Sequence, residues 1–200
     1  MNYITLSIMI ALITVPYSTA TATEVDNKSA PSRNSAKPSA ESDDYSTLYA
    51  RNALKTAENA AGAEDHTVAS SLINLANIYK HQGKLERAEP LYKRALAIYE
   101  KKLGLEHPNV ALTLNNLADV YSATGRYSEA EHLYKRAIAV DEKSFGPDQP
   151  EVANDLYNLA TMYKIQGRYK ESEEYYIQSM AIFEKTLGAD HQFLSILSLR

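Results

Sequence analysis

The sequence predicts an all-α protein, an α-solenoid of antiparallel helix pairs, preceded by a segment of different composition. The first observation is a 42-residue repeat that occurs three times. The second is that apolar residues in each copy follow the 3.6-residue period of an α-helix in two separate stretches. The third is that single glycines fall where these stretches end, as they commonly do at helix C-termini.

The first 22 residues are expected to be a signal peptide. Residues 4–15 form an apolar run of about twelve residues, whereas a membrane-spanning helix needs roughly twenty. Pro16 ends the run, and the small residues at 18–22 fit a signal-peptide cleavage site. No Lys or Arg precedes Lys28, so an uncleaved anchor and a misread start remain open alternatives. Export would place the mature chain, without a membrane span, in the periplasm or outside the cell.

Residues 23–44 are expected to be a disordered linker. They are rich in Ser, Ala, Pro and charged residues and nearly free of large apolar ones, so they cannot bury enough surface to offset the entropy of ordering. Asn27 begins a glycosylation sequon, but a motif this short often occurs by chance.

Composition excludes several classes of protein. The chain has no cysteine, which rules out disulfides, thiolate metal sites, a cysteine nucleophile and the lipid-bearing cysteine of a bacterial lipoprotein. The net charge is -4, with acidic and basic residues interspersed, so no basic stripe predicts nucleic-acid binding.

The repeat organises the remaining sequence. Identical residues recur at a spacing of 42 in all three copies, and about half of the aligned positions match between the first two. Examples are Val68, Val110 and Val152; Leu75, Leu117 and Leu159; Tyr79, Tyr121 and Tyr163; and Gly83, Gly125 and Gly167.

Each copy is predicted to form two helices, as the second copy illustrates. Its first apolar face consists of Val110, Leu114, Leu117, Ala118 and Tyr121. Gly125 follows, in the position of a left-handed residue that ends a helix. A second stretch of the same period then runs to Gly146 and Pro147, through Tyr127, Ala130, Tyr134, Ala137, Ile138 and Asp141.

These strings resemble a tetratricopeptide repeat. The resemblance lies in LNNLADVY at 114–121, GRYSEAE at 125–131 and LYKRA at 133–137. The ordinary repeat has about 34 residues, and the extra residues here fall in the second helix. With the Gly-x-x-His-Pro-x-Val-Ala junction at 104–111, this variant is similar to the kinesin light chain class of repeats. The resemblance implies a right-handed solenoid over residues 45–200, with about three full repeats at about 68–109, 110–151 and 152–193, plus flanking helices.

The two ends of the repeat region are also informative. Residues 45–61 are predicted to form one further helix that packs on the first full repeat through Leu48, Tyr49, Ala53, Leu54, Ala57 and Glu58. Residues 191–200 begin a fourth copy that stops early and carries apolar residues. A solenoid end normally has a polar outer face, so this segment is expected either to fold back as a cap or to dock on another surface.

A search for chemical motifs finds none that predicts catalysis. His66, His107 and His191 recur near repeat junctions, too far apart to share a metal ion, and His81 and His132 have no catalytic pattern beside them. Acidic residues such as Glu131 face basic ones at helix spacing, here Lys135. No phosphate loop or hydrolase motif is present. The sequence therefore predicts no enzyme activity, no cofactor and no metal.

The resemblance implies a concave groove lined by the first helix of each pair. The residues predicted to bind a partner there differ between copies, unlike the core positions. They are Ser70, Ile73, Asn77, Lys80 and His81 in the first copy; Leu112, Asn115, Asp119 and Ser122 in the second; and Asn154, Tyr157, Thr161 and Lys164 in the third.

Asn74, Asn116 and Asn158 occur in every copy. They could grip a peptide backbone, but a hydrogen bond within the scaffold is the favoured interpretation. Some family members bind a terminal carboxylate with a Lys-Asn-Asn-Lys-Arg set. Ile73, Asp119 and Tyr157 interrupt that set here, so a neutral or mildly basic peptide is expected instead.

The expected function is that of an exported scaffold or adaptor, which binds a peptide or a partner protein in its groove. The alternative is a structural subunit that self-associates or docks through its apolar C-terminal end.

Overall fold

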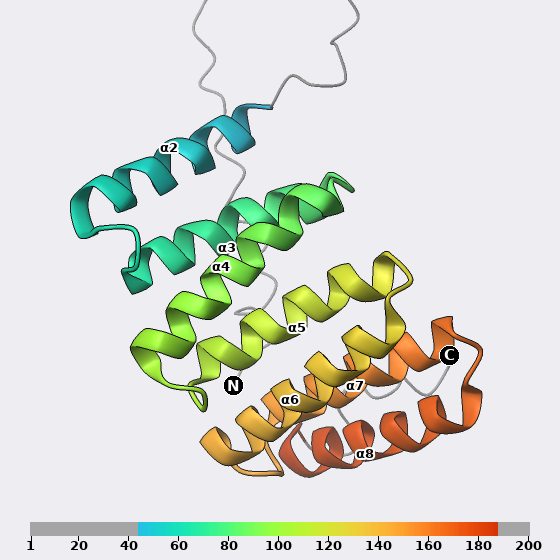
Figure 1. Ribbon diagram of the computed structural model, residues 1–200. Coiled ribbons are helices and arrows are strands. Elements are labelled where there is room, and N and C mark those ends of the chain that lie inside the picture. Colours follow the sequence, from blue (N-terminus) through green and yellow to red (C-terminus); the bar gives the residue numbers. More distant parts are fainter. Residues whose placement is uncertain (1–43, 188–200) are drawn as a thin grey trace, which may run out of the picture. The chain divides into compact units, whose positions relative to one another are not determined.

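The computed structural model describes residues 44–187, which form seven α-helices and no strand (Figure 1). The helices are α2 (Tyr45–Ala61), α3 (His66–His81), α4 (Leu85–Leu103), α5 (Pro108–Ala123), α6 (Tyr127–Phe145), α7 (Pro150–Ile165) and α8 (Tyr169–Leu187). The predicted signal peptide, residues 23–43 of the predicted linker and the unfinished fourth copy lie outside the described residues.

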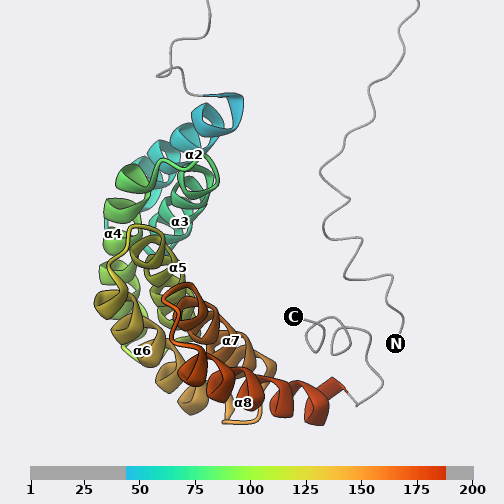
Figure 2. The same cartoon turned by 90° about the vertical axis from the view of Figure 1, so that its right-hand side faces the viewer.

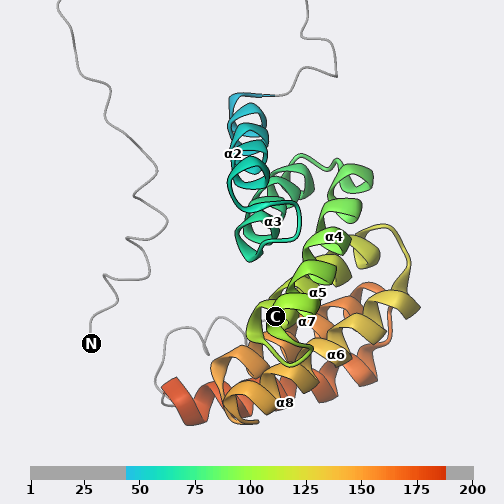
Figure 3. The same cartoon turned by 60° about the vertical axis from the view of Figure 1, so that its left-hand side comes forward.

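The helices repeat with the period of the sequence, which confirms the predicted all-α repeat fold. The first helix of each pair has 16 residues and the second has 19. Within each pair the two helices pack antiparallel (Figures 1 and 3). The pairs stack into an arc with α3, α5 and α7 on its inner side and α4, α6 and α8 on its outer side (Figure 2).

The recurring apolar residues form the core between these helices. Val68, Leu114 and Leu159 are completely buried, and so are the small residues Ala118 and Ala130 at the α5–α6 contact. Alanine at such positions lets two helices approach closely, while the larger neighbours fill the space between them. The 42-residue period of identity is therefore a period of core packing.

The turn between α5 and α6 shows why glycine recurs there. Gly125 has a φ of +77°, and the amide of Arg126 donates to the carbonyl of Tyr121 at 2.8 Å. This left-handed residue lets the chain reverse while it satisfies a helix-end carbonyl.

Gly125→Val is expected to lower the free energy of unfolding by about 1–2 kcal/mol, because a β-branched residue is strained at positive φ. Nothing lies within 4 Å of a Cβ built at this position, so the loss is one of backbone strain and not of collision. Gly125→Asn is the control, since asparagine tolerates this conformation. Equal urea midpoints for the two variants would contradict the interpretation.

Helix α2 packs on α3, but not through the whole predicted face. Thr47 and Ala50 are buried and Leu54 packs against the core. Leu48 and Tyr49 are 50% and 74% exposed, and Ala53 is also exposed; for these three residues the prediction was wrong. The Thr47 hydroxyl accepts from Gln82 Nε2 at 2.9 Å. This contact and the cap at the start of the helix fix the rotation of α2 with Thr47 inward.

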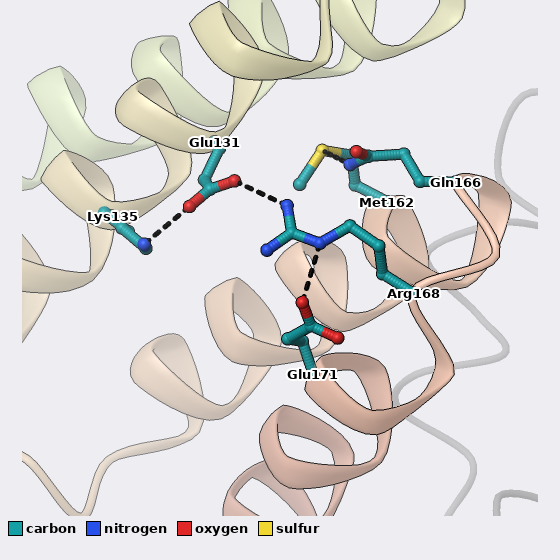
Figure 4. Close-up of polar contacts among 6 residues, drawn as sticks. All are labelled: Glu131, Lys135, Met162, Gln166, Arg168 and Glu171. Carbon is teal, nitrogen blue, oxygen red and sulfur yellow. Dashed lines mark hydrogen bonds and ion pairs between the residues drawn. The ribbon is translucent and has the colours of Figure 1, made fainter.

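Arg168 joins the second and third repeats (Figure 4). Its guanidinium donates to Glu131 on α6 at 3.1 Å and to Glu171 on α8 at 2.8 Å, and it lies 4.3 Å from the centre of the Tyr163 ring. Lys135 also donates to Glu131, at 2.6 Å, which confirms the predicted helix-surface pair. Half-exposed pairs such as these contribute about 0–1 kcal/mol each, so they fix how neighbouring repeats meet more than they stabilise the fold.

Candidate protein-binding groove

The residues predicted to bind a partner all lie on the three inner helices, but their exposure differs. Ser70, His81, Leu112, Asn154 and Lys164 are exposed on the inner helices. Partly buried are Asn77, Lys80, Asn115, Asp119, Ser122, Tyr157 and Thr161. Ile73 is buried in the core and offers no surface to a partner.

Three of the partly buried residues share one contact in the scaffold. In each repeat, a tyrosine of the second helix reaches a polar side chain of the first. Tyr92 donates to Asn77 at 2.5 Å, Tyr134 donates to Asp119 at 2.7 Å, and Thr161 and Tyr176 lie 3.0 Å apart. The sequence held the signal for this contact, because a hydrogen-bond acceptor precedes each tyrosine by 15 residues in every copy.

Lys80 links the first two repeats at the inner side of the arc. Its ammonium donates to Asn116 Oδ1 at 2.9 Å and to Asp119 Oδ2 at 2.8 Å. The amide of Asn116 also donates to the carbonyl of Leu112 at 3.0 Å. For Asn116 the favoured interpretation, a hydrogen bond within the scaffold, is confirmed.

Asp119→Leu is expected to lower the free energy of unfolding by about 2 kcal/mol, because it leaves Tyr134 without its acceptor and removes the ionic partner of Lys80. Asp119→Asn keeps an oxygen for Tyr134 and should lose less than half as much. Urea denaturation measures both variants. A stability of Asp119→Leu equal to that of the unaltered chain would show that these hydrogen bonds contribute nothing.

An acidic pocket of about 390 Å³ opens between α5, the end of α6 and α7. Four of its lining residues are acidic and none is basic. The lining residues are Pro108, Asn109, Leu112, Asn115, Asn116, Asp119, Asp141, Phe145, Glu151, Asn154, Asp155 and Asn158.

Two buried carboxyl groups form the inner part of the acidic pocket. Asp141 is 6% exposed and Asp155 is 3% exposed. Asn115 donates to Asp155 Oδ1 at 2.5 Å. Burial raises the pKa of both carboxyl groups above the ordinary range, and the neighbouring Asp141 raises the pKa of Asp155 further.

Comparison of the copies shows that both aspartates stand where the other copies carry uncharged residues. Asp141 stands where the other copies have Tyr99 and Phe183, which are buried aromatic residues. Asp155 stands where they have Ser71 and Thr113. Loss of the ring volume at 141 helps to open the acidic pocket. The sequence pattern placed Asp141 on an apolar helix face and did not single out Asp155. The signal was present, because at both positions the other two copies have uncharged residues.

The described helices show no metal site and no membrane span. Within residues 44–187, no three histidine or acidic side chains gather closely enough to hold a metal ion. None of the helices in this part of the chain is long and apolar enough to cross a membrane. His107 has a structural contact, because its Nδ1 accepts the amide of Asn109 at 3.1 Å and caps α5.

Stacked helix pairs with a repeating core and a variable inner face define a helical-repeat protein. The model of the tetratricopeptide repeat family matches residues 48–101, 67–143, 110–185 and 151–198. The chain belongs to this family, as the resemblance implied. No curated protein matches the chain by sequence.

Two solved structures show the same fold and confirm the similarity to kinesin light chain repeats. One is a Podospora anserina kinesin light chain-like protein with nearly identical TPR-like repeats, at 26% identity and a TM-score of 0.65, covering 76% of this chain and 72% of that one. The other is BtubC (BKLC) from P. vanneervenii, at 27% identity and a TM-score of 0.64, covering 72% of this chain. This chain spans 57% of the BtubC chain.

Proposed function

We propose that the chain is an interaction scaffold that binds a peptide segment of a partner protein along the inner side of α3, α5 and α7. One observation carries the proposal: exposed side chains on these helices differ from copy to copy, although the core beneath them repeats. Packing accounts for the repeated positions. A specific partner accounts for the variable ones, because specificity requires a particular set of side chains.

The charges of this face indicate the type of peptide. Lys80 is engaged by Asp119, and the acidic pocket presents four carboxyl groups and no base. A peptide that ends in this part of the groove with a free carboxylate would be repelled. The face therefore suits a neutral or mildly basic segment, bound in extended or helical form.

We also infer that the chain acts by binding and not by catalysis. The sequence holds none of the catalytic motifs sought, and the family consists generally of non-catalytic scaffolds.

Selection from a displayed peptide library tests the binding proposal. The groove variant Leu112→Glu/Lys164→Glu changes two exposed inner residues that have no observed role in the scaffold. Its affinity for selected peptides should fall about tenfold or more, because the complex would bury a carboxylate at 112 in place of an apolar contact and would lose the hydrogen bonds that the ammonium of Lys164 can donate. Titration calorimetry measures the change.

The matched control is Ile177→Glu/Lys170→Glu, which likewise replaces one exposed aliphatic residue and one exposed lysine by glutamate, on α8 at the outer side of the arc. This variant should bind the selected peptides as the unaltered chain does. Weakened binding in the control with unchanged binding in the groove variant would move the binding surface to the outer helices and overturn the proposal.

Export is a separate proposal, supported by the apolar run at 4–15 and the small residues at 18–22. Expression of the full chain with a C-terminal tag in a bacterial host should yield a shortened product in the periplasm, starting at residue 21 or 23. N-terminal sequencing and cell fractionation measure this. A full-length product confined to the cytoplasm would contradict export.

A further inference from the structure

Three acceptor oxygens of residues that line the acidic pocket have no donor among the described residues when both of its buried carboxyl groups are ionised. They are Asp141 Oδ1, Asp155 Oδ2 and Asn115 Oδ1. The two aspartates that contribute to this set are more than nine-tenths buried and line the pocket. Buried polar atoms are nearly always hydrogen-bonded, so unsatisfied acceptors on residues that line a cavity indicate a donor that the chain itself does not supply.

The chemistry of the missing donor follows from this set. Three acceptors without a donor match a group that carries only N–H bonds, which is true of guanidinium and ammonium ions and not of hydroxyl or amide groups. Glu151 lines the same pocket and adds negative charge around it, whereas the charge of Asp119 is paired with Lys80. The cavity therefore favours a cation by both hydrogen bonding and electrostatics.

The mouth of the pocket fits the rest of a long basic side chain. Leu112 is 54% exposed and Phe145 is 43% exposed, and both line the cavity. Lysine and arginine place their methylene stems on such apolar surface while the charged head reaches polar partners. The ring of Phe145 can also attract a nearby cation.

The other repeats supply an internal comparison. At the equivalent place in the first copy, Tyr99 fills the space and its hydroxyl lies 2.8 Å from Ser70 Oγ, so no charged group is left there. Only the junction between the second and third copies has an acid at both positions, 141 and 155. A scaffold alone would not require two buried acids, because each costs desolvation energy.

We propose that the acidic pocket binds the guanidinium or ammonium head of a basic side chain of the partner, held between Asp141, Asp155 and Asn115. This inference rests on the proposed function, since it fixes one specificity position within the peptide-binding groove. The raised pKa values of both carboxyl groups agree with it, because a proton shared by the pair satisfies part of the site while the cation is absent.

The probe is Nα-acetyl-L-arginine amide, titrated into the isotopically labelled chain and followed by amide NMR signals. Nα-acetyl-L-citrulline amide is the matched control, because it has nearly the same shape without the charge. The arginine probe should shift the signals of α5, the end of α6 and α7, including the side-chain amide of Asn115. The citrulline probe should bind at least about tenfold more weakly.

Asp155→Thr is the test variant, because threonine occupies the equivalent position in the second copy and is buried there. It should fold and lose the response to the arginine probe. The conservative variant Asp155→Asn removes the charge with little change of volume and should also lose it. Equal shifts in the unaltered chain and in both variants, or shifts with Ca²⁺ and none with the arginine probe, would overturn the inference.

Failure of this inference can be told apart from failure of the proposed function. If library-selected peptides bind the inner face but show no preference for a basic residue and no sensitivity to Asp155→Thr, the groove remains and the cation site is wrong. If the arginine probe binds the pocket while no peptide binding responds to the groove variant Leu112→Glu/Lys164→Glu, the cation site remains and the proposed function is wrong.

Discussion

Asp155→Thr is expected to stabilise the fold by about 2 kcal/mol at pH 8, although it removes a hydrogen bond from Asn115. Replacing a buried charged group by a well-packed residue is often stabilising by about 1–4 kcal/mol. Threonine fits at the equivalent position in the second copy, where Thr113 is fully buried and bonds the carbonyl of Asn109. For a domain of this size, the melting temperature should rise by about 4–8 °C.

The gain should depend on pH in a defined direction. Burial and the neighbouring Asp141 raise the pKa of Asp155 to about 8, above its value in the unfolded chain. The folded state then holds this proton more tightly, so its contribution to stability is full below about pH 4 and is lost as the pH rises toward 8. Asp119, Asp141, Glu151 and the Tyr134 hydroxyl are the titratable groups nearest to it. The variant should therefore differ from the unaltered chain much less at pH 5 than at pH 8.

Thermal unfolding at both pH values measures this difference, with Glu174→Thr as the control. Glu174 is an exposed acid of α8, and its replacement should change stability by less than about 0.5 kcal/mol. An Asp155→Thr variant that is less stable than the unaltered chain at pH 8 would show that the two aspartates stabilise the fold. The two buried acids would then have a structural explanation, and the proposed cation site in the acidic pocket would lose its main support.

Leu114→Ala is expected to have the largest destabilising effect, about 3 kcal/mol. Leu114 is fully buried in the core of the second repeat, and its truncation loses transfer free energy and leaves a cavity. In a repeat array, each repeat is stabilised mainly by its neighbours. A defect in the middle copy should therefore weaken the coupling of the first copy to the third and broaden the urea transition.

The matched control is Leu112→Ala, two residues away on the same helix. Leu112 is 54% exposed, so its truncation should change stability by less than about 0.5 kcal/mol while it removes apolar surface from the groove. Urea denaturation followed by circular dichroism distinguishes the two variants. Similar losses for both would mean that the core assignment of the repeated positions is wrong.

The fold could be predicted from the sequence because the same apolar residues recur at equivalent positions of all three copies. Residues such as Leu117 and Tyr163 recur at the repeat spacing and are buried, since packing imposes the same demand on every repeat. The packing face of α2 was harder to predict, because this helix precedes the three copies and has no complete repeat of its own for comparison. In α2, Leu48 looked like a core residue but is exposed, because local hydrogen bonds of Thr47 set the rotation of the helix.

The groove was predicted only at the level of helices. The family resemblance placed the predicted partner-binding residues on α3, α5 and α7, and these residues lie on those helices. It could not show that Asp119 is held by Tyr134 and Lys80. These contacts cross between helices and repeats, so no local pattern reveals them. The acidic pocket was missed for a related reason. Asp141 and Asp155 lie on different helices, and only the three-dimensional packing brings their carboxyl groups together.

The most direct measurement is a crystal structure of the chain with a library-selected peptide bound. The expected result is a peptide along the inner side of α3, α5 and α7, with a lysine or arginine head group between Asp141 and Asp155. A peptide bound to α4, α6 and α8 at the outer side of the arc, with the acidic pocket empty, would contradict the account.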